Sequence, residues 1–283
     1  MQTPARIFIL TLFAVIAFAG NSVLARFALG DELIGPWSFT LIRLLAGAVV
    51  LAVLVGPRTA FQAGSWYSAA ALLVYAGFFS YAYLMLPTAT GALILFAIVQ
   101  LTMLGAGLAA GERLRVIQWA GTGLAIAGLL ALLSPALAPP SWVGALLMAL
   151  AGIGWGVYSL RGRTSTRPTA QTAGNFTKAA VIASLLAVPL LLWMPEVRPQ
   201  TNGVLLALAS GAITSGLGYA IWYMALPGLS ANRAGVSQLS VPAIAALGGM
   251  VFLGEPITFG FIVASLVILG GVALATLTPS RSK

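Results

Sequence analysis

The chain has 283 residues, of which 60% are hydrophobic and only 7% are charged, with 14 basic residues against 5 acidic ones. A soluble globular protein carries about 25% charged residues because its surface faces water, so this composition predicts a protein whose solvent is lipid. The formal net charge of +9 could indicate nucleic-acid binding, but the basic residues are not clustered and no nucleic-acid-binding motif is present. We therefore expect no nucleic-acid partner. The absence of cysteine and histidine excludes disulfides and removes the commonest metal ligand, so we also expect no metal and no cofactor.

Ten apolar segments follow one another along the chain, separated by charged residues, proline and glycine. Each holds about 20 residues, the length that a helix needs to cross the hydrocarbon core of a bilayer. The first begins after Arg6 and resembles a secretory signal, but apolar sequence continues past Ala19, so we interpret it as a retained helix. The sequence predicts an all-α integral membrane protein with ten transmembrane helices at 6–28, 36–55, 67–86, 89–110, 116–134, 142–161, 172–193, 203–225, 232–253 and 257–277.

The charges in the predicted loops indicate how these helices are oriented. If the N-terminus is cytoplasmic, ten basic residues lie on the cytoplasmic side and only Arg26 and Arg198 lie outside. Four of the five acids, Asp31, Glu32, Glu196 and Glu255, then also lie outside. This bias follows the positive-inside rule, so the sequence predicts a multi-pass protein with both termini in the cytoplasm.

Short phrases recur at an interval of five predicted helices. The matches, each weak alone, occur in the same order in both halves: Phe18 with Trp155, Phe39-Thr40 with Phe176-Thr177, Tyr83-x-x-Leu86-Pro87 with Tyr223-x-x-Leu226-Pro227, and Gly111-Glu112 with Gly254-Glu255. Because five is odd, the second copy enters the membrane inverted. The sequence predicts two inverted-topology five-helix repeats, residues 1–139 and 140–283, around a central cavity, an arrangement typical of secondary transporters.

Several of these residues carry a resemblance to a known family: Arg43, Trp155, the Gly-Glu endings of predicted helices four and nine, and Pro242. The chain resembles, over essentially its whole length, the EamA-type ten-helix exporters of the drug/metabolite transporter superfamily. It is most similar to the YddG-type bacterial exporters of aromatic and other amino acids. The resemblance implies a bacterial inner (plasma) membrane protein whose cavity is lined by predicted helices one, three, four, six, eight and nine. The first half has Val99 where the second has Pro242, so we do not expect full symmetry at the site.

The same resemblance implies that predicted helices five and ten pack together at one edge. Small residues let helices approach closely in a membrane, and Gly121-x-Gly123 and Gly270-Gly271 supply them here. These faces could instead form a dimer. We favour the internal packing and a monomer.

The candidate substrate site consists of aromatic, amide and hydroxyl side chains at helical spacing within the apolar segments. Aromatic walls with a few polar groups can bind a flat apolar side chain reversibly, and an ammonium group can rest on a ring face. Some of these residue types also have an interpretation outside the cavity. Gln100 and Gln238 can instead hydrogen-bond neighbouring helices to one another. Tyr83 and Tyr223 lie near helix ends, so we interpret them as part of an interfacial aromatic belt. The predicted substrate-binding residues are Asn21, Tyr75, Phe79, Phe96, Gln100, Trp155, Tyr158, Tyr219, Trp222, Ser237 and Gln238.

Two charges lie inside predicted helices, where a charge is costly. Arg43 is about 10 Å inside from Pro36 by the helical rise, and Lys178 is nearer the cytoplasmic end of its helix. An arginine at this place is widespread in the resembled family across different substrates. We therefore interpret Arg43 and Lys178 as structural charges in the membrane, with the Arg43 stem able to extend towards Asp31 or Glu32.

The sequence predicts a secondary transporter that exports aromatic and other neutral amino acids, and related small metabolites, by alternating access. The closest alternative is an exporter of another small-metabolite class, such as nucleosides, sugars or cationic drugs. The scarcity of catalytic groups disfavours an enzyme, and the repeat and the lack of charged pore rings disfavour a channel. We expect transport driven by the substrate gradient, with proton coupling through Glu112 or Glu255 as the open alternative.

Overall fold

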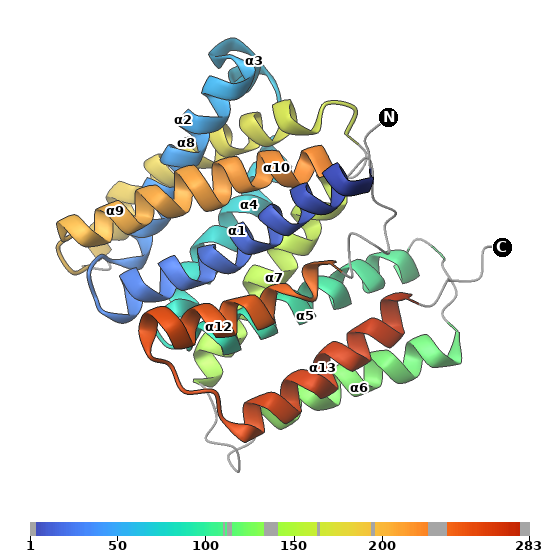
Figure 1. Ribbon diagram of the computed structural model, residues 1–283. Helices are drawn as coiled ribbons and strands as arrows, with labels where there is room; N and C mark the ends of the chain where they lie inside the picture. Colours follow the sequence, from blue (N-terminus) through green and yellow to red (C-terminus); the bar gives the residue numbers. More distant parts are fainter. Residues whose placement is uncertain are drawn as a thin grey trace.

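The computed structural model describes residues 4–109, 111, 115–132, 141–162, 165–193, 196–225 and 237–277, and every regular element within these ranges is helical (Figure 1). The elements are α1 (Pro4–Gly30), α2 (Pro36–Val55), α3 (Pro57–Gln62), α4 (Trp66–Tyr83), α5 (Thr88–Ala109), α6 (Val116–Leu132), α7 (Trp142–Gly162), α8 (Pro168–Trp193), α9 (Thr201–Ala209), η2 (Ser210–Leu217), α10 (Gly218–Ala225), α12 (Val241–Leu253) and α13 (Phe259–Leu277).

Many of these helices are long and apolar enough to cross a membrane. Within the described ranges six meet both criteria: α1, α2, α5, α7, α8 and the continuous stretch Thr201–Ala225, which comprises α9, η2 and α10. Three further apolar stretches are shorter: α6, α12 and residues Phe259–Ala275 of α13. The side chains on the outside are themselves large and apolar, for example Val53, Leu185 and Leu266. The protein is therefore all-helical, and its surface suits a lipid solvent rather than water.

Proline and glycine set several helix boundaries. Pro36 and Pro57 occupy the first turns of α2 and α3, where a missing N–H costs nothing and the fixed φ angle suits a helix. Gly254 ends α12 with a φ of +64°, a left-handed conformation that glycine adopts without a Cβ penalty. The predicted helix 232–253 is interrupted, because a turn at 239–240 precedes α12 and Pro242 lies in the first turn of α12. The earlier part of that prediction, up to residue 236, lies outside the described residues.

One helix departs from α-helical geometry in a way that the sequence analysis did not predict. Between α9 and α10 the backbone forms η2, an eight-residue π-helix, a form that often accompanies functional sites. A Cβ placed on Gly211 of η2 would touch the backbone of Arg43. The π-helix therefore lies directly against α2, and only a glycine fits at the crossing.

The helices pack in matching sets. In one set, α7 packs against α4 and α5. In the matching set, α1 packs against the stretch α9–η2–α10 and against α12. Three further contacts pair α2 with α8, α5 with α12, and α6 with α13. In Figure 1, α6 and α13 lie side by side at the lower edge, and α13 also packs against α5.

The predicted close packing of α6 on α13 is confirmed, and two of the four glycines expected to permit it, Gly121 and Gly271, lie at the contact. A Cβ on Gly121 would lie 2.6 Å from the carbonyl oxygen of Gly271, and a Cβ on Gly271 would lie 2.6 Å from that of Gly121. Gly123 and Gly270 face open space. The two helices thus meet backbone to backbone along one face only.

Candidate functional site

A small cavity lies where α1, α4, α5, α7 and α10 converge. The converging side chains leave room for about one water molecule. A larger molecule could enter only if some of them moved. The cavity is lined by Phe18, Asn21, Ser22, Tyr75, Phe79, Leu95, Phe96, Trp155 and Tyr219.

Trp155 is the centre of the aromatic wall. Its ring centroid lies 5.0 Å from that of Tyr75 and 4.9 Å from that of Tyr219. Phe18 packs edge-on against Trp155 at 6.0 Å and against Tyr219 at 5.7 Å. These separations lie in the favourable range for aromatic pairs. The rings form one continuous surface that could hold a flat apolar group.

Asn21 provides the polar side of the cavity. Its Nδ2 donates to the Tyr75 hydroxyl at 3.2 Å, and its Oδ1 accepts from Ser210 Oγ at 2.7 Å and from Thr214 Oγ1 at 3.3 Å. Ser210 and Thr214 belong to η2. The π-helix thereby places hydroxyl groups towards α1 in the middle of an otherwise apolar stretch.

Arg43 is buried beside this cavity, with 1% of its surface exposed. Its Nε donates to Ser215 Oγ at 3.0 Å and its Nη2 to the Tyr75 hydroxyl at 2.8 Å. The guanidinium lies over the rings of Tyr75 and Phe79, at 5.1 and 4.9 Å from their centroids. The expectation that its stem extends towards Asp31 or Glu32 is wrong, because the cation–ring contacts and hydrogen bonds hold it inside the bundle.

The predicted site residues are only partly brought together. Asn21, Tyr75, Phe79, Phe96, Trp155 and Tyr219 line the cavity. Tyr158 and Trp222 do not line the cavity themselves. Their rings pack against two lining residues, Tyr158 against Trp155 and Trp222 against Phe18. The remaining three do not line it: Gln100 and Gln238 are buried elsewhere, and Ser237 is half-buried. Of the helices expected around the cavity, α12 contributes no lining residue.

The prediction of an aromatic belt for Tyr83 and Tyr223 is wrong. A belt residue faces lipid headgroups, whereas Tyr83 is fully buried and Tyr223 is 8% exposed. Tyr83 packs edge-on against Phe79 at 4.7 Å, and its hydroxyl donates to the carbonyl of Thr88 at 3.4 Å. The two tyrosines of the repeated phrase are therefore interior residues.

The sequence analysis missed the hydroxyl groups of η2 as part of the site. A signal was present, since the run from Ser210 to Gly216 places two serines, a threonine and two glycines inside an apolar segment. Phe18 was matched to Trp155 but not assigned to the site, although its ring touches three others. The other missed lining residues are Ser22 and Leu95.

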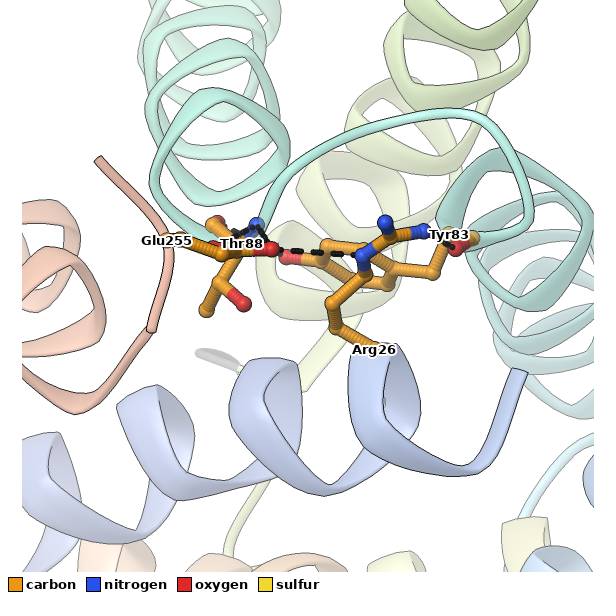
Figure 2. A network of polar contacts seen from close by, with 4 residues as sticks. All are labelled: Arg26, Tyr83, Thr88 and Glu255. Atoms are coloured by element: carbon orange, nitrogen blue, oxygen red, sulfur yellow. Dashed lines mark hydrogen bonds and ion pairs between the residues drawn. The ribbon is translucent and has the colours of Figure 1, made fainter. Parts of the chain in front are cut away.

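One end of the bundle, which we call the acidic end, bears Asp31, Glu32, Glu196 and Glu255. Figure 2 shows how Glu255, which follows α12, reaches the start of α5 and the side chain of Arg26 on α1. Its carboxylate accepts from the backbone N–H of Thr88 at 2.8 Å and pairs with Arg26 Nε at 3.2 Å. Arg26 Nη1 also donates to the carbonyl of Tyr83 at 3.0 Å. A single carboxylate thus joins three segments.

Glu196 makes a second connection at the acidic end. It accepts from the backbone N–H groups of Trp37 at 2.6 Å and Ser38 at 3.0 Å, and from Ser38 Oγ at 2.8 Å. Both N–H groups belong to the first turn of α2, where helices lack internal acceptors and favour negative charge. Glu196 therefore caps a helix that lies far from it in sequence.

The opposite end, which we call the basic end, bears Arg161 and Lys178. Lys178 Nζ donates to the carbonyl oxygens of Phe61 and Ala63. Arg161 Nε donates to Ser68 Oγ at 2.9 Å, and Asn175 Oδ1 accepts from the backbone N–H of Ser65 at 2.8 Å. These contacts join the segment around α3 to α7 and α8.

The described residues offer little chemistry for catalysis. No carboxylate among them lines the cavity, and no group of three histidine, cysteine or acidic side chains in the described ranges could hold a metal. Glu112, the fifth acid, lies outside the described residues. The arrangement can bind a molecule between rings and polar groups, which is what a binding cavity requires.

Comparison with known proteins identifies the family. The family model described as "EamA-like transporter family" matches residues 142–277. An uncharacterized protein of Pseudomonas aeruginosa, PA1977, is 50% identical over 273 residues, which cover 95% of this chain and 94% of that protein. The chain belongs to the EamA-like transporter family. The predicted membership of the drug/metabolite transporter superfamily is thereby confirmed.

Relatives of this EamA-family protein include named exporters. The aromatic amino acid exporter YddG of Ancylobacter novellus is 28% identical over 216 residues, 74% of each chain. The threonine/homoserine exporter RhtA of Salmonella typhimurium is 32% identical over 143 residues, 49% of this chain and 46% of that protein. A crystal structure at 25% identity superposes with a TM-score of 0.63 and covers 94% of this chain and 97% of the other. The protein is thus a membrane transporter of small molecules, and the cavity is its candidate transport site.

Proposed function

We propose that this EamA-family protein is a secondary transporter that exports aromatic and other neutral amino acids across the bacterial inner membrane. The observation that carries the proposal is the aromatic cavity around Trp155, closed to about the size of a water molecule. Relatives named as exporters of aromatic amino acids and of threonine support the substrate class. Flat rings with a few hydrogen-bonding groups suit reversible binding of such molecules.

The architecture that we propose is two inverted five-helix repeats, residues 1–139 and 140–283, with ten membrane-crossing helices and both termini cytoplasmic. The matching packing sets support it, because exchanging α1 with α7, α2 with α8, α4 with the stretch α9–η2–α10, α5 with α12 and α6 with α13 reproduces the principal contacts. The family match, which begins at residue 142, fits the second repeat. Such repeats place a substrate site near the membrane midplane.

We propose that the substrate contacts Trp155, Tyr75, Tyr219 and Asn21 directly, with Phe79 and Phe96 completing the wall. The polar groups of Gln100, Ser237 and Gln238 would come into reach only in a more open state, because none lines the closed cavity. Tyr158 and Trp222 would hold Trp155 and Phe18 in place.

Alternating access requires that each end of the bundle open in turn. The acidic end, which we place on the external side, is closed by contacts that cross between the repeats: Arg26 with Glu255, Thr88 with Glu255, and Ser38 with Glu196. We propose that these contacts break and that α1 separates from α12 when this end opens. No carboxylate in the described residues lines the cavity, so we propose that the substrate gradient or exchange drives transport.

Reconstitution in liposomes tests the proposed function. Uptake of labelled phenylalanine and of threonine is measured for the wild type, for Trp155→Ala and for Trp193→Ala, a matched control because Trp193 is 86% exposed on the outer surface. We expect saturable uptake that Trp155→Ala lowers at least about tenfold, since a buried aromatic anchor contributes more than 1.4 kcal/mol, and that the control retains. Saturable flux of a nucleoside or a cationic drug, with none of either amino acid, would overturn the substrate class and leave a carrier of another metabolite.

A further inference from the structure

The polar groups beside the cavity form one cluster in which the acceptors are already occupied. The Tyr75 oxygen already accepts from Arg43 Nη2 and Asn21 Nδ2. Asn21 Oδ1, an amide acceptor, is occupied by two hydroxyl groups of η2. The hydroxyl of Tyr219 joins the same cluster beside Tyr75 and Arg43.

Two nitrogen donors at this place are buried and have no partner. Arg43 Nη1 and Trp155 Nε1 have no hydrogen bond, although both side chains are nearly inaccessible to solvent. Leaving a buried donor unsatisfied is costly, and more so when the group is charged. Unpaired donors at an interior site call for an explanation, and a role in binding an acceptor group of the substrate is one.

The buried charge of Arg43 is not neutralised by any carboxylate in the described part of the chain. Glu196 and Glu255 are engaged with helix N-termini at the acidic end, and Glu255 also pairs with Arg26. The groups around the guanidinium are hydroxyls and aromatic rings. A cation in a low-dielectric interior gains much from a nearby anion.

We infer that Arg43, Tyr75 and Trp155 form an anion subsite that binds the carboxylate of the transported molecule. Tyr75 and Trp155 line the cavity, so the Tyr75 hydroxyl and Trp155 Nε1 donate to the carboxylate directly. Arg43 lies behind the Tyr75 ring and supplies the positive charge through the Tyr75 hydroxyl. This inference rests on the proposed function and deepens it, because it limits the substrates to small molecules that carry a carboxylate. It also gives Arg43 a role beyond the structural one expected from the sequence.

Competition between phenylalanine and phenylalaninamide tests the subsite. The two molecules share the ring and the ammonium group, but the amide lacks the negative charge. In liposomes that take up labelled phenylalanine, we expect the amide to compete at least about tenfold more weakly than unlabelled phenylalanine, the size of effect for a charge-assisted hydrogen bond. Equal competition by the two molecules in the wild type would overturn the inference.

Three variants locate the effect. Trp155→Phe keeps an aromatic ring and removes only the N–H, while Tyr75→Phe removes only the hydroxyl. Each should reduce the preference for the acid over the amide by roughly three- to tenfold, and Arg43→Gln should abolish it. Arg58→Gln is the matched control, because Arg58 is exposed at the other end of α2, and it should keep the full preference. If Arg43→Gln does not fold, a full preference retained in both conservative variants still overturns the inference.

A binding measurement separates failure of the subsite from failure of the proposed function. The melting temperature of the purified protein is recorded with benzoate and with benzamide, which need no transport to bind. A rise with benzoate alone, absent in Trp155→Phe, supports the anion subsite even if no amino acid is carried. Equal rises with both compounds, or none with either, overturn it even if amino-acid transport is found.

Discussion

At each end of the bundle, charged side chains connect helices that are distant in sequence, and we call each set of contacts a joint. The charged side chains are acidic at one end and basic at the other. At the acidic end, Glu196 and Glu255 accept from backbone N–H groups at the starts of α2 and α5. At the basic end, Lys178 and Arg161 donate to carbonyl and hydroxyl oxygens around α3 and α4. Ser38 and Asn175, which directly precede the repeated Phe-Thr pairs, each take part in one joint. The comparison shows that both ends use charged side chains to connect helices that are distant in sequence, with negative charge at one end and positive charge at the other.

The strength of the two joints should differ because their hydrogen bonds differ. A carboxylate at a helix N-terminus meets aligned N–H groups and the positive end of the helix dipole. A lysine that meets two carbonyl oxygens forms charge–dipole contacts with a flexible side chain. Four experiments, ordered from the largest expected effect to the smallest, test how similar the two ends are and where they differ.

The backbone contacts of the two joints should be equally intolerant of added volume. A Cβ on Gly174 would overlap the carbonyl of Ala63, and a Cβ on Gly203 would overlap that of Leu33. Because neither neighbour is a flexible side chain, Gly174→Ala and Gly203→Ala should each destabilise the protein by about 3 kcal/mol. Melting temperatures in detergent measure this. A large effect at one end and none at the other would break the comparison.

Removing Glu196 should have the next largest effect. Glu196→Ala leaves Trp37 N–H, Ser38 N–H and the Ser38 hydroxyl without their acceptor, which should cost about 2 kcal/mol. Glu196→Gln, which keeps an acceptor oxygen, should cost less and serves as the matched variant. Equal melting temperatures for both variants and the wild type would show that this cap does not hold the acidic end together.

The pair Arg26–Glu255 should show a smaller, measurable coupling. The side chains are 27% and 15% exposed, so solvent screens the pair only in part. A double-mutant cycle with Arg26→Gln and Glu255→Gln should give an interaction energy of about 1 kcal/mol. An interaction energy of zero would mean that Glu255 stabilises the acidic end only through its hydrogen bond with Thr88 N–H, and that the contact with Arg26 contributes nothing.

Lys178→Met should have the smallest effect. The substitution keeps an apolar stem and removes the ammonium group, which donates to the carbonyl oxygens of Phe61 and Ala63 and lies 5.8 Å from the ring centroid of Trp66. We expect a loss of about 0.5 kcal/mol in a melting experiment. A loss equal to that of Glu196→Ala would show that the two joints are equally strong and that their chemistry does not matter.

The sequence predicts the helices better than it predicts the site. Composition and Pro/Gly punctuation place a helix in each apolar segment, with α2 as predicted at 36–55, because lipid forces backbone groups to bond within a helix. The burial of Tyr83 and Tyr223 could not be predicted, since being near a helix end does not show whether a ring faces lipid or protein. Nor could the π-helix at 210–217, or the close crossing of its Gly211 over Arg43. The partners of Arg43 lie on α4 and η2, and no helical periodicity relates these segments.

The most direct test of the account is phenylalanine exchange by a protein locked at the acidic end. A Cβ on Gly248 of α12 would lie 3.9 Å from Cβ of Val23 on α1, a separation that suits a disulfide, and the chain has no cysteine of its own. In liposomes, Val23→Cys/Gly248→Cys should exchange labelled phenylalanine when reduced and lose most of that flux when oxidised, while each single variant stays active. Flux that is the same in the oxidised and reduced protein would contradict an alternating-access carrier that opens by separating α1 from α12.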